Sequence, residues 1–213
     1  MEKSFVTQQI NYIESEVYKI VKPIGFTKHG RTLHRFVSDD ISQVINFQCG
    51  QAYRDATHLL SVNIGIRIPE CFERQFHVVN NKTYYHEYEC NLRTRLGIVN
   101  AKNIKGEKVY NLYKDVSEIC SDIIHEIEND VLPVFDILSS REAVLNYRRE
   151  YPWFDALNDH LILLEEAMIY GHQNDLQKAK ELFDKYYEIA LQNSKRCPGH
   201  IDYLNDLRIR FNF

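Results

Sequence analysis

The sequence predicts an α+β protein in which an antiparallel sheet of about five strands is packed by helices and followed by a C-terminal helical hairpin. In several segments before residue 113, apolar side chains recur at every second position, as in strands with one buried face. From Asp115 the apolar spacing changes to about 3.6 residues, which is typical of amphipathic helices. A run of strands followed by a run of helices is typical of the α+β class.

The first expected element is a helix over residues 4–22. Its apolar residues form one helical stripe, and Ser4 can cap its N-terminus. Pro23 and Gly25 follow, and both residue types commonly end helices. The sequence therefore predicts one helix before the sheet begins.

The clearest strand pattern covers residues 59–68. Five apolar residues alternate there with polar or small ones, namely Leu60, Val62, Ile64, Ile66 and Ile68. The same alternation predicts further strands over residues 33–37, 42–49, 87–99 and 109–113. Gly65 lies in the middle of the clearest strand and leaves room for another group to approach the backbone.

Capping-box spacings predict where the later helices begin. Asp115 and Glu118 are three residues apart, so a helix is expected from Asp115. Ser139 and Glu142 repeat this spacing and predict a helix that extends to about residue 150. Pro133 lies between these starts and is expected to interrupt the chain's helical path.

Two domains are expected, an α+β domain over residues 1–150 and a helical hairpin over residues 151–213. Asn174-Asp175 forms the predicted turn of the hairpin, and small Ala and Gly residues allow its two helices to approach closely. This pattern is similar to one tetratricopeptide-type unit. Because no second copy follows, the unit cannot form a solenoid, and we expect it to pack on the sheet domain. A peptide-binding repeat surface is the alternative.

Composition favours a cytoplasmic protein. The chain is 44% hydrophobic with a net charge of -4, so its bulk charge gives no attraction to nucleic acid or acidic membranes. No apolar run approaches the roughly 20 residues that span a bilayer, and the first ten residues lack the apolar core of a signal peptide. Five scattered cysteines without a CxxC pair indicate reduced thiols.

No cofactor, metal or catalytic residue is predicted. The chain lacks the common sequence signatures of nucleotide-binding, zinc-protease and hydrolase chemistry. His86 and Cys90 would share one strand face, but no third and fourth zinc ligand follows at matching spacing. The expected partner is another protein, with nucleic acid and membranes disfavoured.

The strongest candidate site is the polar face of the expected sheet. It carries amides and arginines, whose hydrogen bonds are directional and often bidentate. The predicted partner- or ligand-binding residues are Asn46, Gln48, Asn63, Arg67, Arg93 and Arg95. Three interpretations stay open: an ordinary solvated or helix-covered face, a contact surface for a protein or ligand, or the floor of a catalytic site.

Several motifs also suggest a family. Residues 24–69 contain a GF turn, a GRT strand, the sequence INFQ and the sequence VNIGI in that order. Cys90, Arg95 and Gly97 then follow at the spacing of a Cys-x-x-x-x-Arg-x-Gly strand. Over roughly residues 5–150, the chain resembles the bacterial family called domain of unknown function 4304. It departs from the family at Val109-Tyr110, where an aromatic pair is usual.

The resemblance implies a small cytoplasmic bacterial module and no particular activity. Stand-alone modules of this size and class often bind other proteins, which is an analogy rather than a site-based argument. The leading hypothesis is therefore a non-catalytic protein-binding module of immunity or accessory type. The alternative is a binding domain or enzyme for an anionic small molecule, with Arg67, Arg93 and Arg95 as anion clamps and His34 as a base.

Overall fold

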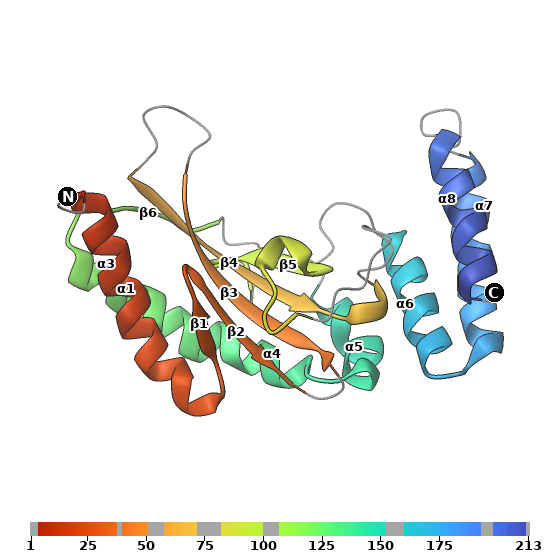
Figure 1. Cartoon of the computed structure of the whole chain (residues 1–213), viewed down its shortest axis with the longest axis horizontal. Helices are drawn as coiled ribbons and strands as arrows, with labels where there is room; N and C mark the ends of the chain where they lie inside the picture. Colours follow the sequence, from red (N-terminus) through yellow and green to blue (C-terminus); the bar gives the residue numbers. More distant parts are fainter. Residues whose placement is uncertain are drawn as a thin grey trace. The chain divides into compact units, whose positions relative to one another are not determined.

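An antiparallel sheet of six strands organises the first part of the protein, whose computed structural model is drawn in Figure 1. The strand order is β1-β2-β3-β4-β5, and β6 pairs with β4. The strands are β1 (Thr27–His29), β2 (Thr32–Phe36), β3 (Ser42–Cys49), β4 (Leu59–Arg67), β5 (Leu92–Arg95) and β6 (Val109–Asn111). The structure describes residues 4–37, 40–50, 58–71, 82–99, 107–151, 160–192 and 198–211.

The chain divides into two compact units. The first contains residues 1–68 and 81–154, and the second contains residues 69–80 and 155–213. The architecture confirms the predicted α+β class with C-terminal helices. The expected domain boundary after residue 150 stays a prediction.

Strand pairing gives the sheet two chemically different faces. Ile64 lies opposite Ile45, and Val62 lies opposite Phe47, so apolar side chains from neighbouring strands collect on what we call the inner face. These inner-face side chains are each at most 1% exposed: Leu33, Ile45, Phe47, Leu60, Val62, Ile64 and Ile66. The alternate residues of the same strands point to the opposite side, which we call the outer face.

Helices of the first unit cover the inner face (Figure 1). They are α1 (Phe5–Val21), α3 (Val116–Glu126) and α4 (Leu132–Ile137). Gln43 on β3 donates from Nε2 to the backbone oxygen of Phe135 on α4, at 2.6 Å. Lys28 on β1 pairs with Glu14 on α1, at 2.9 Å. Because hydrogen bonds and ion pairs depend on direction, these contacts help to fix the positions of α1 and α4 on the sheet, in addition to the apolar packing.

Two predicted caps are confirmed. The side chain of Ser4 accepts a hydrogen bond from the Thr7 backbone nitrogen, at 3.3 Å. The Asp115 carboxylate accepts one from the backbone nitrogen of Ser117, at 2.7 Å, at the start of α3. Short polar side chains satisfy helix N-termini in this way, so the sequence signal and the structure have the same physical cause.

Three local predictions are wrong. Residues 87–99 form a short 3₁₀ turn, η3 (Glu87–Glu89), before strand β5, rather than one long strand. The helix expected from Ser139 is α5 (Arg141–Tyr147), and Ser140 caps it by accepting from Ala143. The helical path does not break at Pro133: a π-helical turn, η4 (Ile127–Val131), leads directly into α4. Proline is tolerated there because a first-turn nitrogen needs no intrahelical partner.

Two further 3₁₀ segments, η1 (Lys22–Ile24) and η5 (Arg148–Glu150), follow α1 and α5. The second unit contains α6 (Leu161–His172), α7 (Leu176–Gln192) and α8 (Pro198–Phe211). A short turn joins α6 to α7, which lie side by side, as expected for the hairpin (Figure 1). A third helix, α8, also packs on α7: Tyr187 donates to the side-chain oxygen of Asn205, at 2.9 Å.

Candidate interaction surface

Four of the six predicted site residues form one connected row on the outer face. Asn46, Asn63 and Arg95 are direct neighbours across β3, β4 and β5, and Gln48 lies two residues from Asn46. Asn63 donates from Nδ2 to Gln48 Oε1 at 2.8 Å and to Asn46 Oδ1 at 3.3 Å. Arg95 donates from Nε to Asn63 Oδ1 at 3.1 Å. We call Asn46, Gln48, Asn63 and Arg95 the amide–arginine row.

An acidic residue closes the row at its β5 end. Arg95 forms an ion pair through Nη1 with Glu107, which also accepts a hydrogen bond from Ser61, at 3.3 Å. Arg95 is partly exposed, with 44% of its side chain open to solvent, whereas Asn63 is 3% exposed. The row therefore has a fixed, buried centre and open ends.

Arg93 lies beside the row, on the same face of β5. Its Nε donates to Glu87 at 2.6 Å, and 48% of its side chain is exposed. It lies opposite Gly65 in the strand pairing. The structure thus places Arg93 and Arg95 together at one surface, as predicted.

Arg67 is separated from these residues by burial. It is 1% exposed, and its guanidinium lies over the ring of Tyr85, at 3.8 Å from the ring centroid. A guanidinium over an aromatic face is stabilised by the quadrupole of the ring. Arg67 therefore serves in the packing of the unit and offers almost no surface to a partner.

Residues 82–91 cover part of the outer face. Cys90 lies against Gly65 so closely that a Cβ at residue 65 would be 2.6 Å from its sulfur. The ring of Tyr84 stacks on His29 of β1, with 4.1 Å between ring centroids. The close approach predicted at Gly65 is real, but the group that approaches belongs to the chain itself. The pocket over Gly65 that an anion-binding site would need is therefore filled.

His34 lies under the same cover and is unsuited to act as a base. It is 1% exposed, and its ring contacts Phe36 edge-on with centroids 4.6 Å apart. Burial, together with the positive charge of His29 and Arg67, lowers the pKa of His34 from 6.5 to about 4. A general base works best with a pKa near the working pH, so His34 would be a poor base near neutrality.

Burial of neutral His34 predicts a specific pH dependence of stability. The unfolded chain binds a proton at this residue more tightly than the folded chain, so stability falls as the pH falls from 6.5 towards 4. Between pH 7 and pH 5, we expect a loss of about 2 kcal/mol. Urea unfolding of wild type and His34→Gln at both pH values measures it: the variant should lack this component. The control variant His125→Gln, at an exposed histidine, should keep the pH-dependent loss. If the free energy of unfolding changes equally between pH 7 and pH 5 in all three proteins, the assignment to His34 is contradicted.

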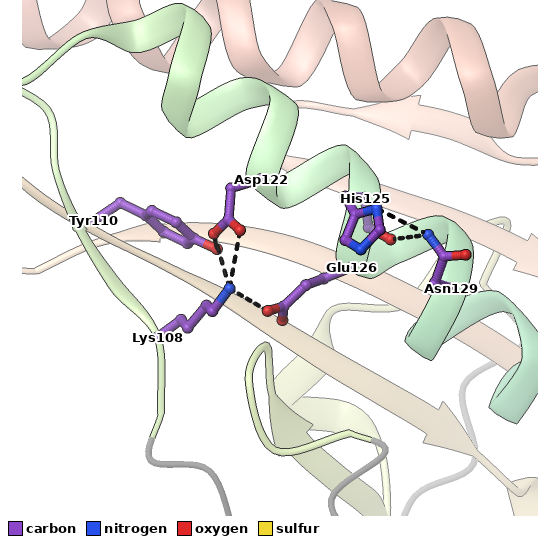
Figure 2. Close-up of polar contacts among 6 residues, drawn as sticks. All are labelled: Lys108, Tyr110, Asp122, His125, Glu126 and Asn129. Carbon is purple, nitrogen blue, oxygen red and sulfur yellow. Dashed lines mark hydrogen bonds and ion pairs between the residues drawn. The ribbon is translucent and has the colours of Figure 1, made fainter.

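Another polar cluster joins β6 to α3 on the covered side of the sheet (Figure 2). Lys108 contacts both carboxylate oxygens of Asp122, at 3.0 and 2.9 Å, and pairs with Glu126. Tyr110 donates to Asp122 at 2.9 Å. His125 and Asn129 interact with each other one turn along the helix.

The pKa shifts in this cluster indicate a structural clamp. Burial alone would lower the pKa of Lys108, but Glu126 and Asp122 outweigh it and raise the pKa. Burial and the bond to Asp122 raise the pKa of Tyr110. Burial opposes the lowered pKa of Asp122, which the bonds from Lys108 and Tyr110 produce. All three shifts move away from neutral pH, so Lys108 and Asp122 stay charged, Tyr110 stays a neutral hydrogen-bond donor, and none of them exchanges protons near pH 7.

The sequence patterns did not predict two features of the structure. One is the clamp, formed by Lys108, Tyr110, Asp122 and Glu126, and the other is the cover, residues 82–91 on the outer face. The clamp had a signal, because Lys108 and Tyr110 are two residues apart at the start of an expected strand, while Asp122 and Glu126 are four apart on a helix. The cover had a weaker one, the aromatic-rich sequence around Tyr84 and Tyr85. Neither signal specifies which distant residues it will contact.

The fold and this surface define a class: an α+β protein with one helix-covered sheet face and one polar face. The family model described as "Domain of unknown function (DUF4304)" matches residues 17–137. This match covers more than half of the chain, and the protein belongs to that family, as the sequence motifs suggested. Comparison with curated proteins and with solved structures gave no match. In the part of the chain that the structure describes, no helix is both long enough and apolar enough to cross a membrane.

Proposed function

We propose that this protein is a non-catalytic protein-binding module and that its contact surface includes the amide–arginine row and Arg93. The observation that supports this is the internal bonding of the row. Asn63 is fixed by hydrogen bonds to three neighbours, so the exposed ends at Gln48 and Arg95 are held in place before any partner arrives. Preorganised polar groups lose less conformational entropy on binding.

The residue types around the row also favour a protein partner. Arginine and tyrosine are enriched among residues that contribute most to protein–protein binding. Tyr88, beside the Arg93 partner Glu87, is 57% exposed. In this proposal the protein is a bacterial, cytoplasmic protein of immunity or accessory type that neutralises or assists a partner in the same cell.

Capture from the organism that makes the protein tests this proposal. Wild type, the double variant Gln48→Ala with Arg95→Ala, and the control Arg149→Ala are purified gently and measured by native mass spectrometry. We expect wild type and control to carry one protein at fixed stoichiometry and the double variant to retain less than about a tenth of it. Arg149 is an exposed arginine outside the row, so it controls for loss of charge.

Urea unfolding provides the fold control, because the substituted side chains are exposed and should cost no more than about 1 kcal/mol. Retention of the partner by the stable double variant would contradict the proposed surface. A bound small molecule without any protein would contradict the binding-module function and favour the anionic-ligand alternative.

A further inference from the structure

From the direction of the hydrogen bonds on the outer face, we infer that the partner presents a pair of carboxylates to Arg93 and Arg95. This inference rests on the proposed function and specifies the chemistry of the partner. Every amide oxygen of the row already accepts a bond: Asn63 Oδ1 from Arg95, and the oxygens of Asn46 and Gln48 from Asn63. Each amide oxygen therefore already has one partner inside the row, which is half of the two bonds that an amide oxygen can accept.

Arg93, Arg95 and Gln48 leave several donor nitrogens open to a partner. Among the described residues, the hydrogen bonds of Arg93 use only Nε, and those of Arg95 use Nε and Nη1. The side chain of Gln48 is held by its oxygen, which accepts from Asn63, and its amide nitrogen has no hydrogen-bond partner within those residues. These open donors are complemented by acceptors, and guanidinium groups bind carboxylates with the best geometry.

The spacing of the donors restricts the partner further. Arg93 and Arg95 are two residues apart on one face of β5, so their Cα atoms are roughly 7 Å apart. Carboxylates two residues apart on an extended segment have the same spacing. A segment of alternating acidic and neutral residues would therefore place one carboxylate at each arginine.

The local charge favours a protein over a nucleic acid. Glu87 pairs with Arg93 and Glu107 pairs with Arg95, so acids alternate with the arginines along this surface. A continuous phosphate backbone would meet both carboxylates as well as the arginines, and nucleic-acid sites instead use clustered positive charge. Two separate carboxylates need only the guanidinium nitrogens that Glu87 and Glu107 leave open, which are both Nη atoms of Arg93 and Nη2 of Arg95 among the described residues.

Side-chain NMR of the full-length protein tests the inference. The probe is a blocked five-residue peptide of alternating threonine and aspartate, and its matched control has asparagine in place of aspartate. We expect the aspartate peptide to shift the Nε–Hε signals of Arg93 and Arg95 and the Gln48 amide signals, with a Kd of about 1 mM. The asparagine peptide should bind at least about tenfold more weakly, as should the aspartate peptide to Arg93→Gln with Arg95→Gln.

Two results would overturn the inference. The first is that the aspartate peptide leaves these side-chain signals unchanged at ~10 mM, ten times the expected Kd. The second is that oligothymidylate shifts them at a lower concentration than the peptide does, which would assign the surface to nucleic acid. Failure of this inference can be told apart from failure of the proposed function. The capture experiment tests protein binding by itself: a captured protein that is lost in the Gln48 and Arg95 double variant would establish binding at this surface even if the partner presents no carboxylates.

Discussion

Replacing Gly65 with alanine is expected to lower the free energy of unfolding by about 3 kcal/mol. The added Cβ would lie 2.6 Å from the sulfur of Cys90 and 2.8 Å from its Cβ, closer than these atoms can approach. Cys90 is 0% exposed and cannot move into solvent without moving the cover, residues 82–91. Urea unfolding of wild type and Gly65→Ala measures the loss.

A second substitution separates this steric effect from the general cost of a strand substitution. In a Cys90→Gly background both crowding atoms are gone, so adding Gly65→Ala should cost less than about 1 kcal/mol. Gly199→Ala is the control, since no atom of the part of the chain that the structure describes lies within 4 Å of the position its Cβ would take. Equal costs of Gly65→Ala in both backgrounds would show that Cys90 does not lie against Gly65.

Replacing Lys108 with methionine is expected to cost about 3 kcal/mol. Glu126 is 7% exposed, and one of its oxygens, Oε2, has no hydrogen-bond partner among the described residues. Lys108 is its ion-pair partner, so methionine would leave a buried carboxylate uncompensated. This cost is at the lower end of the range for removing one partner of a buried ion pair, because 34% of the Lys108 side chain is exposed. Chemical denaturation at pH 7 measures it.

A double-mutant cycle assigns this cost to the ion pair. Replacing Glu126 with leucine together with Lys108→Met removes both charges, and the double variant should be within about 1 kcal/mol of wild type. Lys178→Met controls for loss of a lysine, since Lys178 and Glu181 form an exposed pair on α7 that water screens. Additive effects of the Lys108 and Glu126 changes would show that the two side chains do not interact.

Local patterns in the sequence predicted most of the fold. The alternation around Ile64 gave β4 to within one residue, and residues 42–49 form β3 as expected. The errors arose where tertiary contacts override local pattern. Residues 87–89 alternate like a strand, but turn to form η3 because Cys90 packs on Gly65. The sequence does not show which strand will receive that contact.

The sequence predicted which face of the sheet carries the candidate site residues, but not which of them are exposed to solvent. The two-residue alternation of polar and apolar side chains correctly placed Asn46, Asn63 and Arg95 on one side of the sheet, because side chains along a strand point to alternate faces. The same argument put Arg67 there, and it does lie on β4, but the ring of Tyr85 covers it. Burial of Arg67 depends on the cover, whose position follows from no local pattern.

Arginine-specific labelling of the captured complex tests the central claim most directly. Phenylglyoxal modification of Arg93 and Arg95, read by mass spectrometry, is compared between the free protein and the complex, with exposed Arg149 as internal reference. If the partner binds the amide–arginine row, both arginines should label at least about tenfold more slowly in the complex while Arg149 is unchanged. Unchanged labelling of Arg93 and Arg95 in a stable complex would contradict the account and place the interface elsewhere on the protein.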